Sequence, residues 1–98
     1  MDFFSEVVKG FNHGELQILN VLYESEALNT YTSIPKHVIE KETKLSIADS
    51  RKHLTCLERL MFVSRVTGSK MHSYYITQYG LAAIEKITSE KVGDQWLV

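Results

Sequence analysis

The side chains best suited to chemistry in this sequence are the cations and hydroxyls of one predicted helix, which runs from residue 46 to about 60. Arg51, Lys52 and Thr55 fall on one side of it, where they can contact phosphates and the edges of base pairs. Apolar residues recur at steps of three and four on the other side and predict a buried stripe of Leu54, Leu57 and Met61. The pattern predicts a polar contact surface backed by a hydrophobic core.

Local signals fix the start of this helix and the turn before it. Ser46 and Asp49 form a capping-box-like pair, in which side-chain oxygens accept hydrogen bonds from the first free backbone N–H groups. Ser50 lies on the buried side and is small enough to let another helix cross closely. Residues 43–45 form a turn of the length that joins the two helices of a helix-turn-helix. We therefore expect this helix to be the second of such a pair.

After an N-terminal helix at 1–12, two further helices and one short strand are predicted before that turn. The earlier of these two helices covers about 15–25, with Leu16, Leu19, Leu22 and Tyr23 inward and Ile18 and Val21 on its flank. Residues 29–32 are β-prone and bounded by polar residues, which predicts a lone strand. The second helix runs to about Glu42, with Ser33 as its expected cap, Pro35 in its first turn, and Val38 and Ile39 buried.

A β-hairpin and a last helix are predicted after it. The strands Val63–Thr67 and Ser73–Ile76 flank a turn with Gly68, whose backbone freedom suits a tight reversal. Thr77 can cap a final helix that carries apolar residues at three-residue steps, Leu81, Ile84 and Ile87. The order predicts one α+β, mostly helical domain over residues 1–98, a winged helix-turn-helix with extra N- and C-terminal helices.

The charge is unevenly distributed. The net charge of the whole chain is −1, but six lysines and arginines stand against two acidic residues between Lys44 and His72, giving +4 there and −5 elsewhere. Such polarity is typical of a protein that presents one face to nucleic acid. No apolar run reaches the ~20 residues of a membrane span, and the first residues do not form a signal peptide. We expect an intracellular protein, in the cytoplasm of the host cell, without a membrane partner.

Three local strings resemble those of winged-helix transcriptional regulators, especially the multiple-antibiotic-resistance-type and related small dimeric members. Residues 50–58, SRKHLTCLE, resemble the recognition helix; Phe62-Val63 with Arg65 resembles the start of the wing; residues 75–80, YITQYG, resemble its end. The resemblance spans about 15–87. Family members usually carry Gly where Met61 stands and a charged residue where Leu60 stands, so we expect a differently built corner and a Leu60 that points away from the core.

The resemblance implies a sequence-specific regulator of transcription that binds double-stranded DNA as a homodimer. Its recognition helix would enter the major groove, and its wing would contact the flanking backbone. The DNA-binding residues expected here are Ser46, Ala48, Arg51, Lys52, Thr55, Arg65 and Lys70. No cofactor is expected, and no small-molecule effector is identified.

Apolar residues at both ends favour a dimer, because a three-helix core cannot cover them all. The expected interface residues are Phe3, Phe4, Val7, Phe11, Ile84, Ile87, Trp96 and Leu97. We therefore expect the N-terminal helix at 1–12 and the C-terminal tail at 88–98 to be dimerisation extensions. The alternative is that both ends pack on their own domain.

The single cysteine, Cys56, cannot form an intrachain disulfide. It is either a small half-buried hydrophobic residue or one half of an interchain disulfide, which needs an oxidising compartment or a hyperthermophilic cytoplasm. The compact size, apolar ends and lone cysteine also resemble small winged-helix proteins of crenarchaeal viruses.

Other functions fit parts of the sequence. The near-neutral charge also suits a winged helix used only for protein–protein contact. His53 and Cys56 are one helical turn apart and could share a metal with His37 or His72, but the spacing of a four-ligand zinc site is missing, so we expect no metal and a surface or phosphate-contacting His53. No nucleophile elbow, Gly-rich phosphate loop or paired-carboxylate pattern indicates an enzyme.

Overall fold

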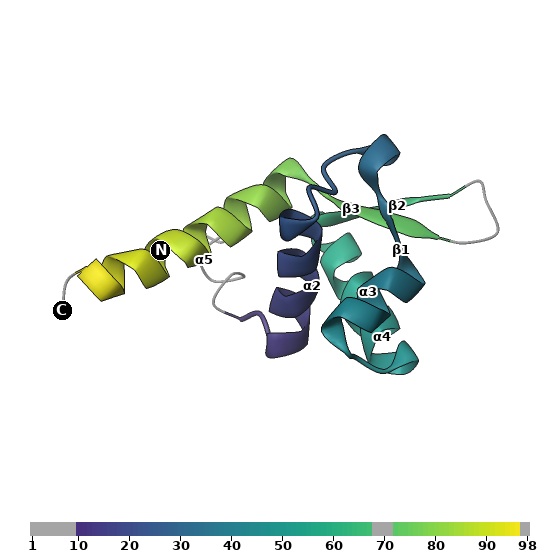
Figure 1. The fold of residues 1–98 in the computed structure, drawn as a ribbon, viewed down its shortest axis with the longest axis horizontal. Coiled ribbons are helices and arrows are strands. Elements are labelled where there is room, and N and C mark those ends of the chain that lie inside the picture. The colour runs from purple at the N-terminus through teal and green to yellow at the C-terminus, as the bar shows by residue number, and fades with distance from the viewer. Residues whose placement is uncertain (1–9, 68–71, 97–98) are drawn as a thin grey trace.

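A computed structural model describes residues 10–67 and 72–96, with side chains as far as residue 87 (Figure 1). The helices are α2 (His13–Glu24), α3 (Lys36–Thr43), α4 (Ile47–Arg59) and α5 (Gln78–Trp96). A 3₁₀ turn, η1 (Thr30–Thr32), and three strands, β1 (Ile34–Pro35), β2 (Val63–Val66) and β3 (Ser73–Ile76), complete the described part. The order confirms the predicted α+β, mostly helical winged helix-turn-helix. The predicted helix at 1–12 lies almost entirely outside the described residues.

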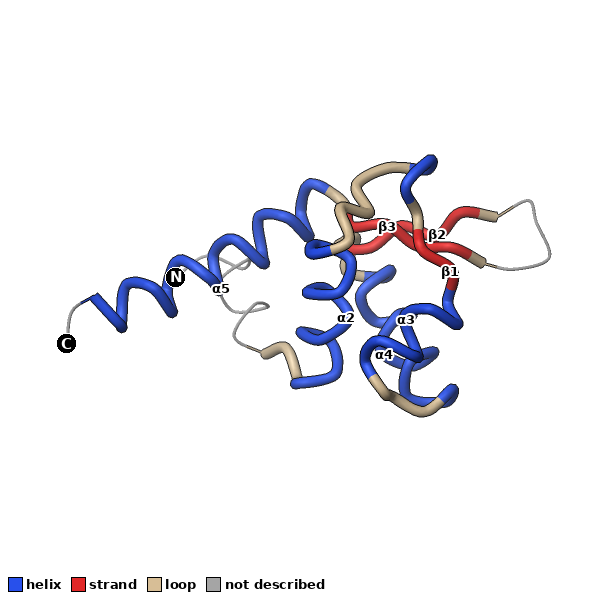
Figure 2. The backbone as a smooth tube through the Cα atoms, viewed as in Figure 1, coloured by secondary structure: helices blue, strands red, loops and turns tan. Residues whose placement is uncertain are grey.

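The three strands form one antiparallel sheet in the order β1-β3-β2. Figure 2 shows them gathered on one side of the helices. The hairpin is paired from Val63 opposite Ile76 to Val66 opposite Ser73, which confirms the two predicted wing strands to within one residue. Side chains alternate along β3, where Tyr74 and Ile76 point into the core, as expected for a sheet covered on one face.

The core is built around α2, which contacts α3, α4 and α5. Ile18, Leu19 and Leu22 of this helix are fully buried. The expectation for its inner face was therefore partly wrong, because Ile18 is inside and Tyr23 is 40% exposed. Helices pack on more than one side of α2, so its buried stripe is centred differently from the stripe that leucine spacing alone suggests.

Residues 29–32 do not form the predicted strand. The side-chain oxygen of Asn29 accepts hydrogen bonds from the backbone N–H groups of Tyr31 (2.9 Å) and Thr32 (3.1 Å), and these bonds close a 3₁₀ turn. The short strand β1 follows at Ile34–Pro35. Ser33 does not cap α3 either, because its hydroxyl donates to the Thr30 carbonyl; Pro35 is the N-cap and makes no side-chain cap bond.

The corner between α4 and β2 is built without glycine. Met61 adopts a left-handed backbone conformation, φ 67°, and is 63% exposed, so it does not extend the buried stripe of α4 as predicted. Leu60 packs against the core, which corrects the expectation that it points outward. The hydroxyl of Thr77 donates to the Met61 carbonyl (2.5 Å) and accepts from the backbone N–H of Gly80 (3.1 Å), which confirms Thr77 as the cap of α5.

Helix α5 is longer than the sequence suggested, because it continues through Gly93 to Trp96. Its first half covers the core: Ile84 is 6% exposed, and Leu81 and Ile87 pack against the same cluster. Figure 1 shows the C-terminal half running away from the other elements. Within the described residues, no helix has the length and apolar character needed to span a membrane.

Candidate nucleic-acid interface

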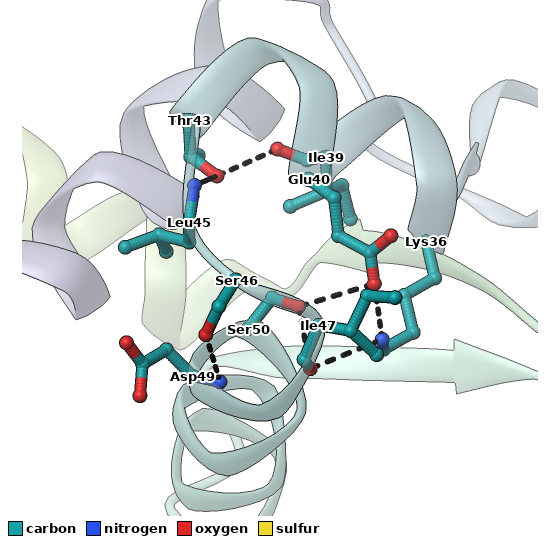
Figure 3. Close-up of polar contacts among 9 residues, drawn as sticks. All are labelled: Lys36, Ile39, Glu40, Thr43, Leu45, Ser46, Ile47, Asp49 and Ser50. Atoms are coloured by element: carbon teal, nitrogen blue, oxygen red, sulfur yellow. Dashed lines mark hydrogen bonds and ion pairs between the residues drawn. The ribbon is translucent and has the colours of Figure 1, made fainter.

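A network of polar contacts holds the first turn of α4 against α3 (Figure 3). Lys36 forms an ion pair with the Glu40 carboxylate and also lies 3.5 Å from the Ile47 carbonyl oxygen. The hydroxyl of Ser50 is 3.2 Å from Glu40 Oε2 and 3.0 Å from the same carbonyl. Ser50 is completely buried, as its small size predicted. The hydrogen bond from Lys36 lowers the pKa of Glu40, so the carboxylate stays charged within the network.

The turn between the two helices is fixed by the backbone. Lys44 takes the left-handed conformation, φ 60°, and its N–H donates to the Glu40 carbonyl at 2.8 Å. Ser46 Oγ then accepts from the N–H of Asp49 at 3.0 Å, which confirms Ser46 as the N-cap of α4. The three residues between α3 and α4 make a compact helix-turn-helix, and α4 is the helix that such a motif presents to a ligand.

The solvent-facing side of α4 is polar and cationic. We call it the outer face, and its residues are Ala48, Arg51, Lys52, Thr55 and Arg59, all exposed. Arg51 and Lys52 form no ion pair with any described residue, including the nearby acidic residues Asp49 and Glu58 of the same helix. Sequence reasoning missed Arg59, although its position four residues after Thr55 places it on the same side.

Arg65 lies beside the outer face on strand β2. Its Nε is 3.5 Å from Glu58 Oε1, so this arginine is partly neutralised within the fold. An open groove of about 380 Å³ is lined by Thr55, Glu58, Arg59 and Arg65. The groove offers two guanidinium groups and a hydroxyl at the surface, a set suited to phosphate. Lys70, the other predicted wing contact, lies outside the described residues.

His53 and Cys56 lie on the side of α4 that faces α2. A Cβ placed on Gly14 would be 2.6 Å from two atoms of the His53 ring, so the half-buried ring lies against α2, and the expected surface or phosphate-contacting role stays a prediction. Cys56 is free and half-buried; burial, together with nearby Glu15, raises the pKa of its thiol. No group of three or more potential metal ligands occurs among the described residues.

Three of the expected dimer residues are used by the domain itself. Phe11 packs edge-on against Phe62, with ring centroids 5.2 Å apart, and Ile84 and Ile87 belong to the core or pack on it. The premise that the domain cannot cover these residues is therefore wrong for Ile84, whereas Phe11 and Ile87 are only partly buried by the domain. The other five fall outside the described side chains: Phe3, Phe4, Val7, Trp96 and Leu97.

The helix-turn-helix formed by α3 and α4, followed by the β2–β3 wing and an exposed cationic outer face, defines a winged helix-turn-helix protein of the nucleic-acid-binding class. Comparison with known proteins agrees. The DNA-binding protein TubR of Priestia megaterium is 36% identical over 85 residues, covering 87% of this chain and 84% of TubR. The chain belongs to the TubR family. Because TubR is a DNA-binding protein, the expectation that the chain is not an enzyme is confirmed.

Solved structures show the same fold. TubR from Bacillus megaterium matches with a TM-score of 0.85 and 35% identity, covering 90% of this chain and 98% of that one. The complex of Staphylococcus aureus MepR with DNA matches with a TM-score of 0.77 and 17% identity, covering 94% of this chain and 73% of the MepR chain. No protein-family model matches the chain. The resemblance to crenarchaeal viral proteins gains no support from these relatives.

Proposed function

We propose that the protein is a transcriptional regulator that binds double-stranded DNA sequence-specifically, as a homodimer, with α4 in the major groove. The observation that carries the proposal is the outer face of α4, where Arg51 and Lys52 are exposed and form no ion pair with a described residue. The TubR relationship supports the same function. Such a regulator acts inside the cell, where its operator is.

The outer face supplies the kinds of contact that DNA recognition needs. Arg51 and Lys52 would contact guanine edges or phosphates, and Thr55 and Ala48 would lie close to base edges. The hydroxyl of Ser46 would reach a phosphate, as cap residues at helix N-termini do. The wing would lie on the flanking backbone and add Lys70 to these contacts.

The groove beside the outer face would hold the DNA backbone. Its lining includes Arg59 and Arg65, on separate elements but on one side of the molecule. Two guanidinium groups at one groove can contact neighbouring phosphates and so fix the register of α4 in the major groove. Because such contacts release counterions, binding should weaken steeply with salt.

The homodimer would form through the two chain ends, 1–12 and 88–98. The support is the course of α5, whose C-terminal half runs away from the other described elements (Figure 1). A helical segment that projects from the other described elements is available to pack against a second subunit. Sedimentation equilibrium at micromolar concentration tests this: a dimer is expected, and a monomer would contradict it. The same run with and without reductant tests whether Cys56 bridges the subunits.

DNA binding is tested by selecting bound sequences from random duplex DNA and then comparing variants on the selected site. Arg51→Ala should weaken binding about tenfold or more, because it removes a base or phosphate contact of the recognition helix. Lys41→Ala is the matched control, since Lys41 is exposed on α3 but lies off the outer face. Equal losses in both variants would mean that only net charge matters, and unchanged binding by Arg51→Ala would remove the assignment.

Protein–protein contact without DNA binding is a second candidate, and one surface feature favours it. Met61 and Tyr79 are 63% and 60% exposed and line an open groove of about 370 Å³ that also includes Val63 and Thr77. Exposed apolar side chains beside a groove are common at protein interfaces. Absence of DNA binding at every salt concentration, together with a stoichiometric protein partner, would favour this function.

A further inference from the structure

Ile47, the first residue of α4, is an aliphatic side chain where the domain gives it little to pack against. It is 64% exposed, whereas the other isoleucines of the described part are buried or pack on the core. Its neighbours along the exposed side are Ala48, Arg51 and Lys52. Single exposed apolar residues are common on protein surfaces, so the exposure of Ile47 leaves it available for a contact but does not assign one.

The position of Ile47 is fixed by the polar network beneath it. Its carbonyl oxygen lies 3.0 Å from Ser50 Oγ and 3.5 Å from Lys36 Nζ, and Glu40 joins these two side chains (Figure 3). The two contacts of Ile47 are made by its backbone carbonyl and leave its side chain available. A β-branched side chain in a helix has essentially one preferred χ1 rotamer. The backbone position of Ile47 and the direction of its side chain are therefore both fixed by the folded domain.

Ile47 also stands where a recognition helix meets bases. The N-terminal residues of such a helix come closest to the base edges in the major groove. Arg51 is four residues further on, which places it on the same side of the helix one turn away. The apolar feature that a major groove displays is the C5-methyl of thymine, which aliphatic side chains contact. An arginine and an isoleucine one turn apart can read a guanine and a thymine of the same half-site.

We propose that Ile47 is a specificity-determining residue that contacts the C5-methyl group of a thymine near the base contacted by Arg51. This inference rests on the proposed function, because it assigns a ligand group to one residue of the proposed DNA surface. It goes beyond that function because it names the base feature that the start of α4 selects. It also assigns to the Lys36–Glu40–Ser50 network the role of positioning Ile47.

The test replaces thymine by uracil, one position at a time, in the duplex obtained by selection. This change removes one methyl group and leaves the base pair intact. The wild-type protein should lose about three- to fivefold in affinity at one thymine per half-site, the loss expected for one uncovered methyl group. Ile47→Ala should bind the thymine and uracil duplexes equally at that position, and Ile47→Val should show an intermediate preference.

The matched control is Leu28→Ala, which truncates another exposed aliphatic residue, 45% exposed, away from α4. It should keep the full preference for thymine. If Ile47→Ala retains that preference, or if the wild type shows none at any position, the assignment of Ile47 is overturned while DNA binding stands. If the wild-type protein selects no sequence from the random pool, the proposed function itself fails. Thermal unfolding of each variant checks that the fold is unchanged.

Discussion

Ser50 Oγ on α4 lies 3.2 Å from the Glu40 carboxylate on α3, and Ser50 is fully buried at this helix crossing. The carboxylate is also held by Lys36 of its own helix. One charged group therefore links the two helices of the helix-turn-helix, at the end of α4 that would approach DNA. The stability of this link depends on the charge of Glu40.

Acid should weaken this link selectively. The pKa of Glu40 is lowered from its ordinary value of 4.5, chiefly by the hydrogen bond from Lys36. A carboxyl group with a lowered pKa in the folded state stabilises the fold above its ordinary pKa and loses that contribution as the pH falls through the folded value. Glu40→Gln should therefore cost about 1 kcal/mol at neutral pH, and its deficit relative to wild type should shrink below pH 4.5.

Urea unfolding between neutral pH and about pH 3 measures this effect. Glu42→Gln is the control, because Glu42 is exposed on the same helix and has no ion pair among the described residues. It should follow the wild-type curve. A deficit for Glu40→Gln that stays constant with pH would show that charge on Glu40 contributes nothing.

Gly80 should tolerate no side chain. A Cβ there would overlap the carbonyl oxygen of Phe62 and the side chain of Ile76. Since a backbone oxygen in the corner cannot move aside, Gly80→Ala should lower the free energy of unfolding by about 1–3 kcal/mol. Gly14→Ala is the comparison, because the three heavy atoms nearest to its added Cβ all belong to the ring of His53, which can rotate. Chemical denaturation should rank Gly80→Ala as clearly the more damaging; the reverse order would refute the argument.

Met61 should be replaceable by glycine with a gain in stability. It is a non-glycine residue at φ 67°, a conformation that costs an L side chain about 1 kcal/mol, and its side chain is largely exposed. Met61→Gly should raise the free energy of unfolding by about 0.5–1 kcal/mol. Met61→Ala keeps a Cβ and hence the strain, so it should give no such gain. Equal effects of the two substitutions, measured by thermal unfolding, would rule out backbone strain as the cause.

Removing the partner of Arg65 should strengthen DNA binding. Glu58 holds the Arg65 guanidinium at 3.5 Å and places a negative charge beside the outer face. Glu58→Gln should free Arg65 for phosphate, tighten binding severalfold and steepen the salt dependence by about one unit of slope. Glu24→Gln, an exposed glutamate at the end of α2, carries the same charge change away from the outer face. DNA titrations at several salt concentrations measure both effects. Equal affinity and equal salt dependence for Glu58→Gln and Glu24→Gln would contradict this prediction.

Local signals in the sequence were sufficient for the helix-turn-helix and the wing. Ser46 and Thr77 cap the helices that they were expected to cap, and the hairpin strands pair in the predicted segments. These features depend on interactions between residues close in sequence, or on alternation that one strand displays by itself. The outer face of α4 could be read from helical periodicity for the same reason.

The features that the sequence did not reveal depend on competition between local conformations, or on packing between residues that are far apart in the chain. Residues 29–32 contain β-prone types, but the Asn29 side chain satisfies two backbone N–H groups locally and favours the turn. Ile84 was expected at a dimer interface because nothing in its own segment shows that α5 covers the core. The Lys36–Glu40–Ser50 network joins two helices, and its geometry becomes visible only when they are placed together.

The anchored start of α4 also bears on the energetics of association. Because the first turn is already capped by Ser46 and tied to α3, the reading surface requires little ordering when a partner arrives. Calorimetry of the complex should then give a heat-capacity change that matches the surface covered at the interface, without the large extra decrement that accompanies folding on contact.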